Sequence, residues 1–205
     1  MPFDEQNRVR AGRSLEELRT PLSWGMPSPE IFDGALLNIE DQLGSSVPEE
    51  VRKRIGVTRN LAVYGAFCYD FITVSVFWSF TCVEMALWTK FRELNPGPFV
   101  LEKKKEQMTV PLEQLQGNLR LHWRIVEMQQ FNGSFRSLVD WAIGEGLVSC
   151  DGSLGDIVQL RNSFAHEFGH VWDAPMAVEV FEKVVEVVNH LWPVELPPKD
   201  GALIA

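Results

Sequence analysis

The chain has 205 residues, of which 45% are hydrophobic and 23% charged, with seven Trp and thirteen Phe. This composition suits one domain with a sizeable core and argues against global disorder. The formal net charge of −9 argues against broad electrostatic affinity for nucleic acid, while a specific RNA or a protein partner stays compatible with it. Three cysteines, Cys68, Cys82 and Cys150, argue against a disulfide framework and favour a reducing cytoplasm.

Residues 1–58 differ in composition from the rest of the chain. They contain many charges, short apolar runs and five prolines: Pro2, Pro21, Pro27, Pro29 and Pro48. We interpret them as an N-terminal arm with short helices around 14–19 and 48–55. The first residues show no apolar signal core, so we expect no export.

A long helix is predicted over residues 60–94, with a bend near Gly65. Apolar residues recur at three- and four-residue spacing in two neighbouring stripes, so the helix should be central or lie at a dimer interface. The first stripe is Phe67, Phe71, Val74, Trp78, Thr81, Met85 and Trp88, and the second is Phe77, Phe80, Leu87 and Phe91.

The most apolar part of this helix, residues 71–83, is too short to span a bilayer, which requires about 20 residues. Asp70 and Glu84 bracket it. We therefore expect a buried helix and no membrane association.

The rest of the chain shows helical patterns separated by clear breaks. Asn95-Pro-Gly-Pro ends the long helix. The charged run 102–106 is most simply a solvated loop or helix end, and the alternative is a phosphate-binding patch. Further helices are predicted over 111–131 and 134–147, from Ser153, and from Asp173. No convincing strand alternation and no repeat is present. The expected fold is all-α, a helical bundle over 59–195 with a C-terminal tail at 196–205.

The segment 161–170, Arg-Asn-Ser-Phe-Ala-His-Glu-Phe-Gly-His, matches two unrelated catalytic patterns. On a helix, Arg161 shares an apolar stripe with Val158, where a charge is costly unless it is paired or functional. The neighbouring polar stripe is Gln159, Asn162, Ser163, His166 and His170.

A purely structural interpretation pairs Arg161 with Glu84 or Asp70 and treats His166 as an ordinary surface histidine. Glu84 lies in a strongly apolar helix, so it is either the buried counter-ion of Arg161 or an active-site carboxylate. The counter-ion role is favoured on physical grounds.

The run 154–166, Leu-Gly-Asp-Ile-Val-Gln-Leu-Arg-Asn-Ser-Phe-Ala-His, resembles the signature helix of HEPN domains. In that family an Arg, a polar residue such as Asn, and a His four to six residues beyond the Arg form the motif. The upstream helix that carries Glu84, the segment 135–147 and the closing helix from Asp173 are similar to the surrounding helices. The resemblance covers about 60–193.

This resemblance implies a metal-independent endoribonuclease without a cofactor. Arg161 would clamp the phosphate, His166 would transfer protons and Asn162 would orient one of them, with Glu84 and Ser163 in support. The products would be a 2′,3′-cyclic phosphate and a 5′-hydroxyl.

Positions five apart on a helix point about 140° away from each other, so one copy builds a poor site. The resemblance to HEPN nucleases implies a two-fold homodimer, in which the motifs of both copies lie in one cleft. The resemblance further implies a toxin–antitoxin or phage-defence setting, with RNA as substrate and an antitoxin as a possible partner. Some family members are non-catalytic binding or assembly modules, and the acidic balance keeps that alternative open.

The second alternative is a zinc metallopeptidase. His166 and His170, four apart, would hold the metal, and Glu167 would activate water. The context expected for such enzymes, a strand-rich lobe before the helix and a third ligand after it, is missing from the sequence pattern. Gly169 and the Asp173-Ala-Pro segment also indicate that the helix ends close to His170.

Overall fold

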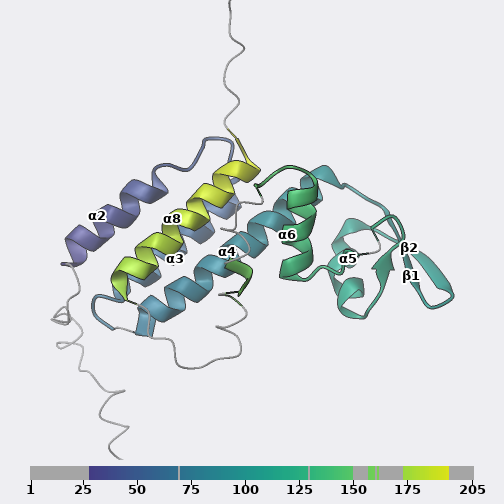
Figure 1. Ribbon diagram of the computed structural model, residues 1–205, viewed down its shortest axis with the longest axis horizontal. Helices are drawn as coiled ribbons and strands as arrows, with labels where there is room; N and C mark the ends of the chain where they lie inside the picture. The colour runs from purple at the N-terminus through teal and green to yellow at the C-terminus, as the bar shows by residue number, and fades with distance from the viewer. Residues whose placement is uncertain are drawn as a thin grey trace, which may run out of the picture.

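A computed structural model describes residues 28–68, 70–128, 130–149, 157–159, 161 and 173–193. These residues are mostly helical, as expected, but they also form a three-stranded sheet (Figure 1). The prediction of a mostly helical fold is confirmed, and the small sheet was not predicted.

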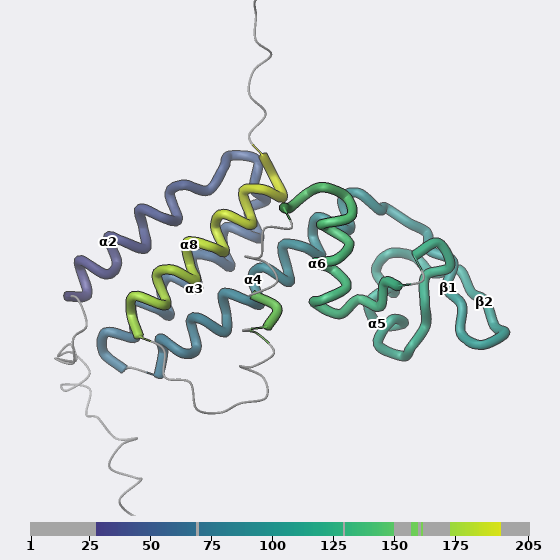
Figure 2. The backbone as a smooth tube through the Cα atoms, viewed as in Figure 1, coloured from purple at the N-terminus to yellow at the C-terminus, as the bar shows by residue number. Residues whose placement is uncertain are grey.

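Four helices lie side by side in the larger part of the molecule. They are α2 (Pro29–Glu40), α3 (Glu49–Tyr64), α4 (Asp70–Leu94) and α8 (Ala174–Leu191). Helix α4 contacts α3, α8 and the shorter α6 (Phe135–Gly144), while α2 covers α3 and α8 (Figures 1 and 2). The predicted central position of α4 is confirmed.

Residues 29–58 belong to the core and do not form an arm. Phe32, Leu36 and Ile39 on α2 are buried, and so are Val51 and Ile55 on α3. Their spacing of three and four residues puts each set on one helix face. The domain boundary expected at residue 58 falls inside α3, so the prediction is wrong for this segment. The short helix expected at 14–19 lies outside the described residues.

The expected helix over 60–94 is two helices. Helix α3 ends at Tyr64, and α4 begins at Asp70 after a turn. Gly65 at this turn packs so closely against Ile72 that a side chain would not fit. This close approach requires a glycine at the turn. The sequence predicted a bend within one helix here, whereas the structure has a break between two helices.

The buried face of α4 is only partly the predicted one. Phe80, Leu87 and Phe91 are fully buried, whereas Phe71 and Phe77 are more than a third exposed. Helix α4 has the length and composition to cross a membrane, and it is the one such helix among the described residues; 56% of its most apolar 18-residue window is buried. Burial of this extent is typical of a core helix, which can be as long and as apolar as a membrane-spanning helix.

Residues 99–125 form a lobe beside the helices, which we call the sheet lobe. Strands β1 (Phe99–Lys103), β2 (Glu106–Val110) and β3 (Arg124–Ile125) pair antiparallel in the order β2-β1-β3, and α5 (Leu112–Arg120) lies between β2 and β3. The charged run 102–106, expected to be a solvated loop, forms the β1–β2 turn and its flanks. The helix expected over 111–131 is limited to α5.

An aromatic cluster joins the sheet lobe to the helices. The rings of Phe91 and Phe131 stack with centroids 4.6 Å apart. Phe99 stacks on Phe91 from the lobe side at 6.0 Å, and Trp141 of α6 meets Phe91 edge-on at 5.0 Å. Trp88 contacts Phe131 at 5.9 Å. Buried aromatic pairs of this kind fix the position of one unit against another.

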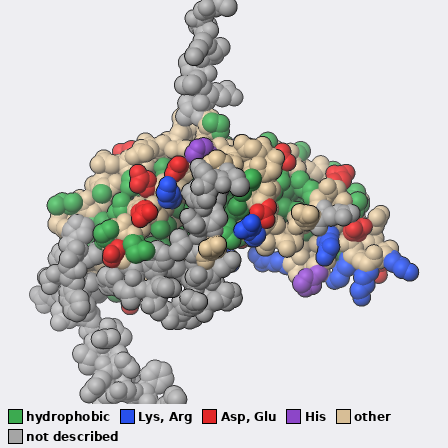
Figure 3. Space-filling model, viewed as in Figure 1, with side chains coloured by type: hydrophobic (Ala, Val, Ile, Leu, Met, Phe, Trp, Pro, Cys, Tyr) green, Lys and Arg blue, Asp and Glu red, His purple; other side chains and the backbone are tan. Residues whose placement is uncertain are grey.

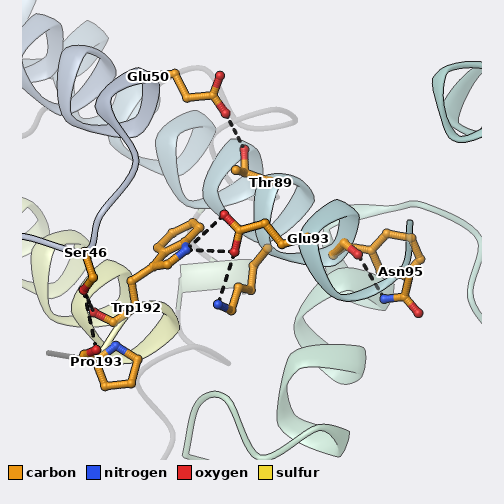
Figure 4. A network of polar contacts seen from close by, with 9 residues as sticks. Ser46, Glu50, Thr89, Glu93, Asn95, Trp192 and Pro193 are labelled. Carbon is orange, nitrogen blue, oxygen red and sulfur yellow. Dashed lines mark hydrogen bonds and ion pairs between the residues drawn. The ribbon is translucent and has the colours of Figure 1, made fainter. Parts of the chain in front are cut away.

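The predicted starts of α6 and α8 are confirmed. Ser134 caps α6 by accepting a hydrogen bond from Ser137 N, and Asp173 caps α8 by accepting one from Met176 N. The chain after α8 is held by Trp192, whose indole N–H donates to the Glu93 carboxylate of α4 at 3.0 Å. Ser46 Oγ donates to the Trp192 carbonyl at 2.9 Å (Figure 4). These contacts tie the last described residues to the core.

Candidate functional site

Arg161 and Glu84 form an ion pair between two segments that are far apart in the sequence. Nη2 of Arg161 lies 3.5 Å from Oε2 of Glu84. Glu84 comes from the middle of α4, and Arg161 lies in helical backbone close after the described residues 157–159. The Arg161 guanidinium also lies 6.0 Å from the ring centroid of Phe135, the first residue of α6.

The local sequence explains why these side chains meet. Ile157 and Val158 are buried while Gln159 is exposed, so this short stretch has the amphipathic pattern that the sequence predicted. Arg161, three residues beyond Val158, lies at the edge of the same buried face. Glu84 lies four residues after Phe80 and three before Leu87, both buried, so it borders the buried face of α4.

The pair is half-buried. The side chain of Arg161 is 36% exposed and that of Glu84 is 26% exposed. The predicted pairing is therefore observed, but the prediction that Glu84 would be a buried counter-ion is corrected, because water reaches both groups. A partly solvated pair of this kind contributes little to stability, typically up to about 1 kcal/mol.

Phe135 is a member of the site that sequence reasoning missed. Its ring is buried, and the ring centroid lies 6.0 Å from the guanidinium carbon of Arg161. A cation over an aromatic ring gains roughly 0.5–1 kcal/mol at exposed positions and orients the guanidinium plane. The sequence showed Phe135 only as the first residue of a capped helix, which gives no signal for this contact.

The arrangement presents an oriented cation at the protein surface. Glu84 lies beside one guanidinium nitrogen, and the Phe135 ring lies near the same group. Arginine carries five N–H donors in a planar fork that matches the oxygens of phosphate or carboxylate. A held, solvent-accessible Arg is therefore suited to binding such an anion.

The other predicted site residues lie outside the described part of the chain. These are Asn162, Ser163 and His166 of the nuclease motif, and Glu167 and His170 of the zinc motif. Their roles stay predictions.

The described structure bears on the zinc interpretation in two ways. A small sheet does precede the segment 161–170, so the expected lack of strands there was wrong. Within the described ranges, no group of three His, Cys, Asp or Glu side chains is arranged to hold a metal ion.

Two shallow hollows lie elsewhere on the described surface. One, of about 370 Å³, is lined by residues of α6 and the preceding loop, including Ser137, Asp140 and Trp141. The other, of about 520 Å³, lies at the end of α8 beside Gln42 and includes Glu186 and His190. Glu84 and Arg161 line neither, so neither belongs to this site.

Comparison of the chain with protein-family models, with curated proteins and with solved structures gave no match.

Proposed function

We propose that the protein is a metal-independent endoribonuclease of the HEPN type, acting on RNA as a homodimer in the cytoplasm. The observation that carries the proposal is the held state of Arg161 between Glu84 and Phe135. A structural arginine needs only a counter-ion, whereas a phosphate clamp also needs access to solvent. Arg161 has a counter-ion in Glu84 and is accessible to solvent.

The proposed reaction is an internal transesterification of RNA. The 2′-oxygen attacks the adjacent phosphorus and forms the 2′,3′-cyclic phosphate, while the bond from phosphorus to the 5′-oxygen breaks. A base removes the proton of the 2′-hydroxyl, and an acid protonates the leaving 5′-oxygen. His166 serves in this proton transfer, Asn162 and Ser163 orient the groups, and Arg161 neutralises the charge that develops on the phosphoryl oxygens.

Two copies of the chain are proposed to share one site. Positions five apart on a helix point about 140° apart, so a two-fold dimer would bring the His of one copy towards the Arg of the other. A toxin–antitoxin or phage-defence role, with an antitoxin as partner, belongs to the same proposal and is supported by the resemblance alone.

Cleavage of RNA in the presence of EDTA tests the proposal. Activity should persist in the chelator and fall by about 10²–10³-fold in Arg161→Ala, the cost of removing one group that stabilises transition-state charge. His166→Ala should lose activity as well. Arg136→Ala is the matched control, because Arg136 is an exposed arginine on α6 that pairs with Asp140 at 2.9 Å. It should cleave like the wild type.

The same experiment separates the alternatives. An intact dimer that cleaves no RNA would favour the binding or assembly module. Stoichiometric zinc that is lost in His170→Ala, together with peptidase activity, would favour the metallopeptidase. Mixing the Arg161→Ala and His166→Ala proteins should restore part of the cleavage if two copies share one site, and no recovery would contradict the shared cleft.

A further inference from the structure

The far end of the sheet lobe gathers basic side chains from three segments of the chain. Figure 3 shows blue side chains collected at this end of the molecule. We call this surface the basic end; it consists of Lys103, Lys104, Lys105, Arg120, His122 and Arg124. All of these side chains are exposed except Lys103, which is half-buried.

The segments of the basic end are held together by specific contacts. Lys103 Nζ donates a hydrogen bond to the carbonyl of Leu121 at 2.7 Å, which fixes the β1–β2 turn against the end of α5. Arg124 lies opposite Glu102 in the β1–β3 register. These contacts fix the backbone of the basic end.

The backbone of both turns is specialised. Lys104 and His122 have φ values of 57° and 65°, in the left-handed region that non-glycine residues seldom occupy. Residues in this region commonly sit at turns whose surroundings hold them in place. Each turn thus presents its side chain from a constrained position.

The cations of the basic end differ from those in the rest of the described structure. Elsewhere, Lys and Arg side chains pair with carboxylates, donate to backbone carbonyls or stack on Trp rings; the carboxylate pairs are those of Lys53, Arg59, Lys90, Arg136, Arg161 and Lys183. The other contacts are those of Arg52, Arg54 and Arg92. Among the described residues, Lys104, Lys105, Arg120 and Arg124 have no such partner.

The sheet lobe is also less acidic than the chain as a whole. Residues 99–125 contain five Lys and Arg against three Glu, whereas the whole chain has 19 Lys and Arg against 28 Asp and Glu. Glu102 and Glu106 lie beside the lysines and lower the local potential, yet unpaired cations from three segments converge beyond them. Among the described residues, the unpaired cations gather on this surface, which favours polyanion binding there.

We propose that the basic end binds the phosphate backbone of single-stranded RNA and so delivers the substrate to the protein. The cations contact successive phosphates, and the exposed His122 ring offers a stacking surface for a base. The choice of RNA among polyanions rests on the proposed nuclease function. Binding to the lobe itself does not require cleavage.

The proposal sets a salt dependence. Four unpaired cations that each neutralise one phosphate give a slope of log K against log salt of about −2.8 for a single strand. Affinity should then fall about 50-fold between ~50 and ~200 mM salt. Removing two of the cations should halve this slope, to about −1.4.

A fluorescently labelled 2′-O-methyl RNA oligonucleotide tests binding independently of cleavage, because it lacks the 2′-hydroxyl nucleophile. Binding is measured by fluorescence anisotropy as a function of salt. The double variant Lys104→Gln/Lys105→Gln removes two cations from the basic end. Lys53→Gln/Lys183→Gln is the matched control, since it changes the net charge equally at exposed helical positions that are paired with Glu49 and Glu186.

The expected result is weaker binding and a halved slope in the lobe variant, with wild-type binding in the control. Arg120→Gln/Arg124→Gln should behave as the lobe variant does and replaces it if the turn variant does not fold. Equal weakening in the lobe and control variants would overturn the proposal, and so would wild-type protein that does not bind the oligonucleotide. Polyglutamate bound as tightly as the oligonucleotide would also overturn it, in favour of an acidic protein partner.

Failure of this inference is distinguishable from failure of the proposed nuclease. Binding of the 2′-O-methyl oligonucleotide is measured without cleavage, so Lys104→Gln/Lys105→Gln should weaken it whether or not the wild type cleaves RNA. RNA cleavage without lobe-dependent binding would refute only the RNA-binding lobe. Lobe-dependent binding without cleavage would refute only the nuclease.

Discussion

The carboxylate of Glu84 and the guanidinium of Arg161 meet at 3.5 Å, where the central helix α4 faces the segment that carries the nuclease-like motif. Both groups keep contact with solvent, so their pairing adds little to stability. The pairing places the carboxylate beside the proposed phosphate clamp, where it restricts the positions that the guanidinium takes up if the proposal holds. Glu84 is thus a positioning residue for the proposed phosphate clamp.

Glu84→Gln should reduce cleavage through kcat. Loss of the carboxylate releases the guanidinium, and a misplacement of about 1 Å in a catalytic group can cost up to about 10²-fold in rate. We expect a fall in kcat of about 10- to 100-fold, with KM unchanged or lower because a negative charge near the phosphate site is removed. Steady-state cleavage kinetics measure both constants.

Urea unfolding provides the control for this variant. The free energy of unfolding should change by less than about 1 kcal/mol, as expected for a solvated ion pair. A larger loss of stability with normal kcat would assign Glu84 a structural role. Glu84→Asp, which keeps the charge, should recover part of the rate.

Leu36→Ala should destabilise the protein by about 2–5 kcal/mol, the usual cost of emptying a buried leucine position. Leu36 is 0% exposed in α2, and the adjacent Leu37 is 39% exposed. Leu37→Ala is therefore the matched control and should change the free energy of unfolding by less than about 0.5 kcal/mol. Equal effects in urea unfolding would show that α2 does not pack into the core.

Local signals in the sequence predicted the elements that depend on neighbouring residues. Asp173 caps α8, and Asn95-Pro-Gly-Pro ends α4, where the structure places both. The α2 pattern, Phe32, Leu36 and Ile39, was equally readable, but five prolines and many charges in residues 1–58 obscured it. Composition averaged over a long segment hid a short amphipathic helix.

The sheet could not be predicted with the same means. In β1, Phe99 and Leu101 are buried and Val100 is exposed, an alternation of only a few residues that then meets the lysines. Strand β3 has two residues and exists through its pairing with β1. Such pairing is non-local, so the strand signal within each segment is weak.

The candidate site was partly predictable for a related reason. A charge on an apolar helix stripe requires a partner, and the sequence indicated Glu84 or Asp70 as the partner of Arg161. The contact between Arg161 and Phe135 depends on how α6 packs, and neither residue's neighbours in sequence indicate it.

Trp192→Phe should lower the free energy of unfolding by about 1–2 kcal/mol. The variant loses the hydrogen bond from the indole to Glu93, and bonds to charged groups contribute about 1.5–3 kcal/mol when they are buried. We expect a loss near the lower end of that range, because the Glu93 side chain is 41% exposed and therefore partly solvated. Glu93→Gln keeps an acceptor and should cost less. Equal stability of Trp192→Phe and wild type in thermal unfolding would contradict the role of this contact.

Gly133→Ala should loosen the junction between the sheet lobe and the helices. Gly133 has a φ of 72°, and a Cβ there would lie 3.0 Å from Leu119 and 3.2 Å from Trp88. Strain and crowding should together cost more than about 1 kcal/mol. Gly117→Ala in α5 is the control, since nothing lies within 4 Å of the added Cβ. It should stabilise by about 0.5–1 kcal/mol, because alanine is the better helix former. Unfolding curves in which both variants shift in the same direction would contradict this contrast.

Cys82 should make stability fall at alkaline pH. Burial raises the pKa of the Cys82 thiol above its ordinary value of 9.0, while the hydrogen bond with Thr58 and the charge of Arg54 act in the opposite direction. The folded protein therefore holds the thiol proton more tightly than the unfolded chain does. The resulting stabilisation is fully present below the unfolded pKa and is lost as pH rises through the folded pKa.

The measurement is the free energy of unfolding in urea from neutral pH to above pH 9, for wild type and Cys82→Ala. The difference between the two proteins isolates the contribution of the thiol from that of every other group. Cys82→Ala should be less stable at neutral pH because it loses buried volume, and the gap should narrow as pH rises. A gap that stays constant or widens would mean that the thiol is not held protonated by the fold, since a group with equal pKa in both states contributes no pH dependence.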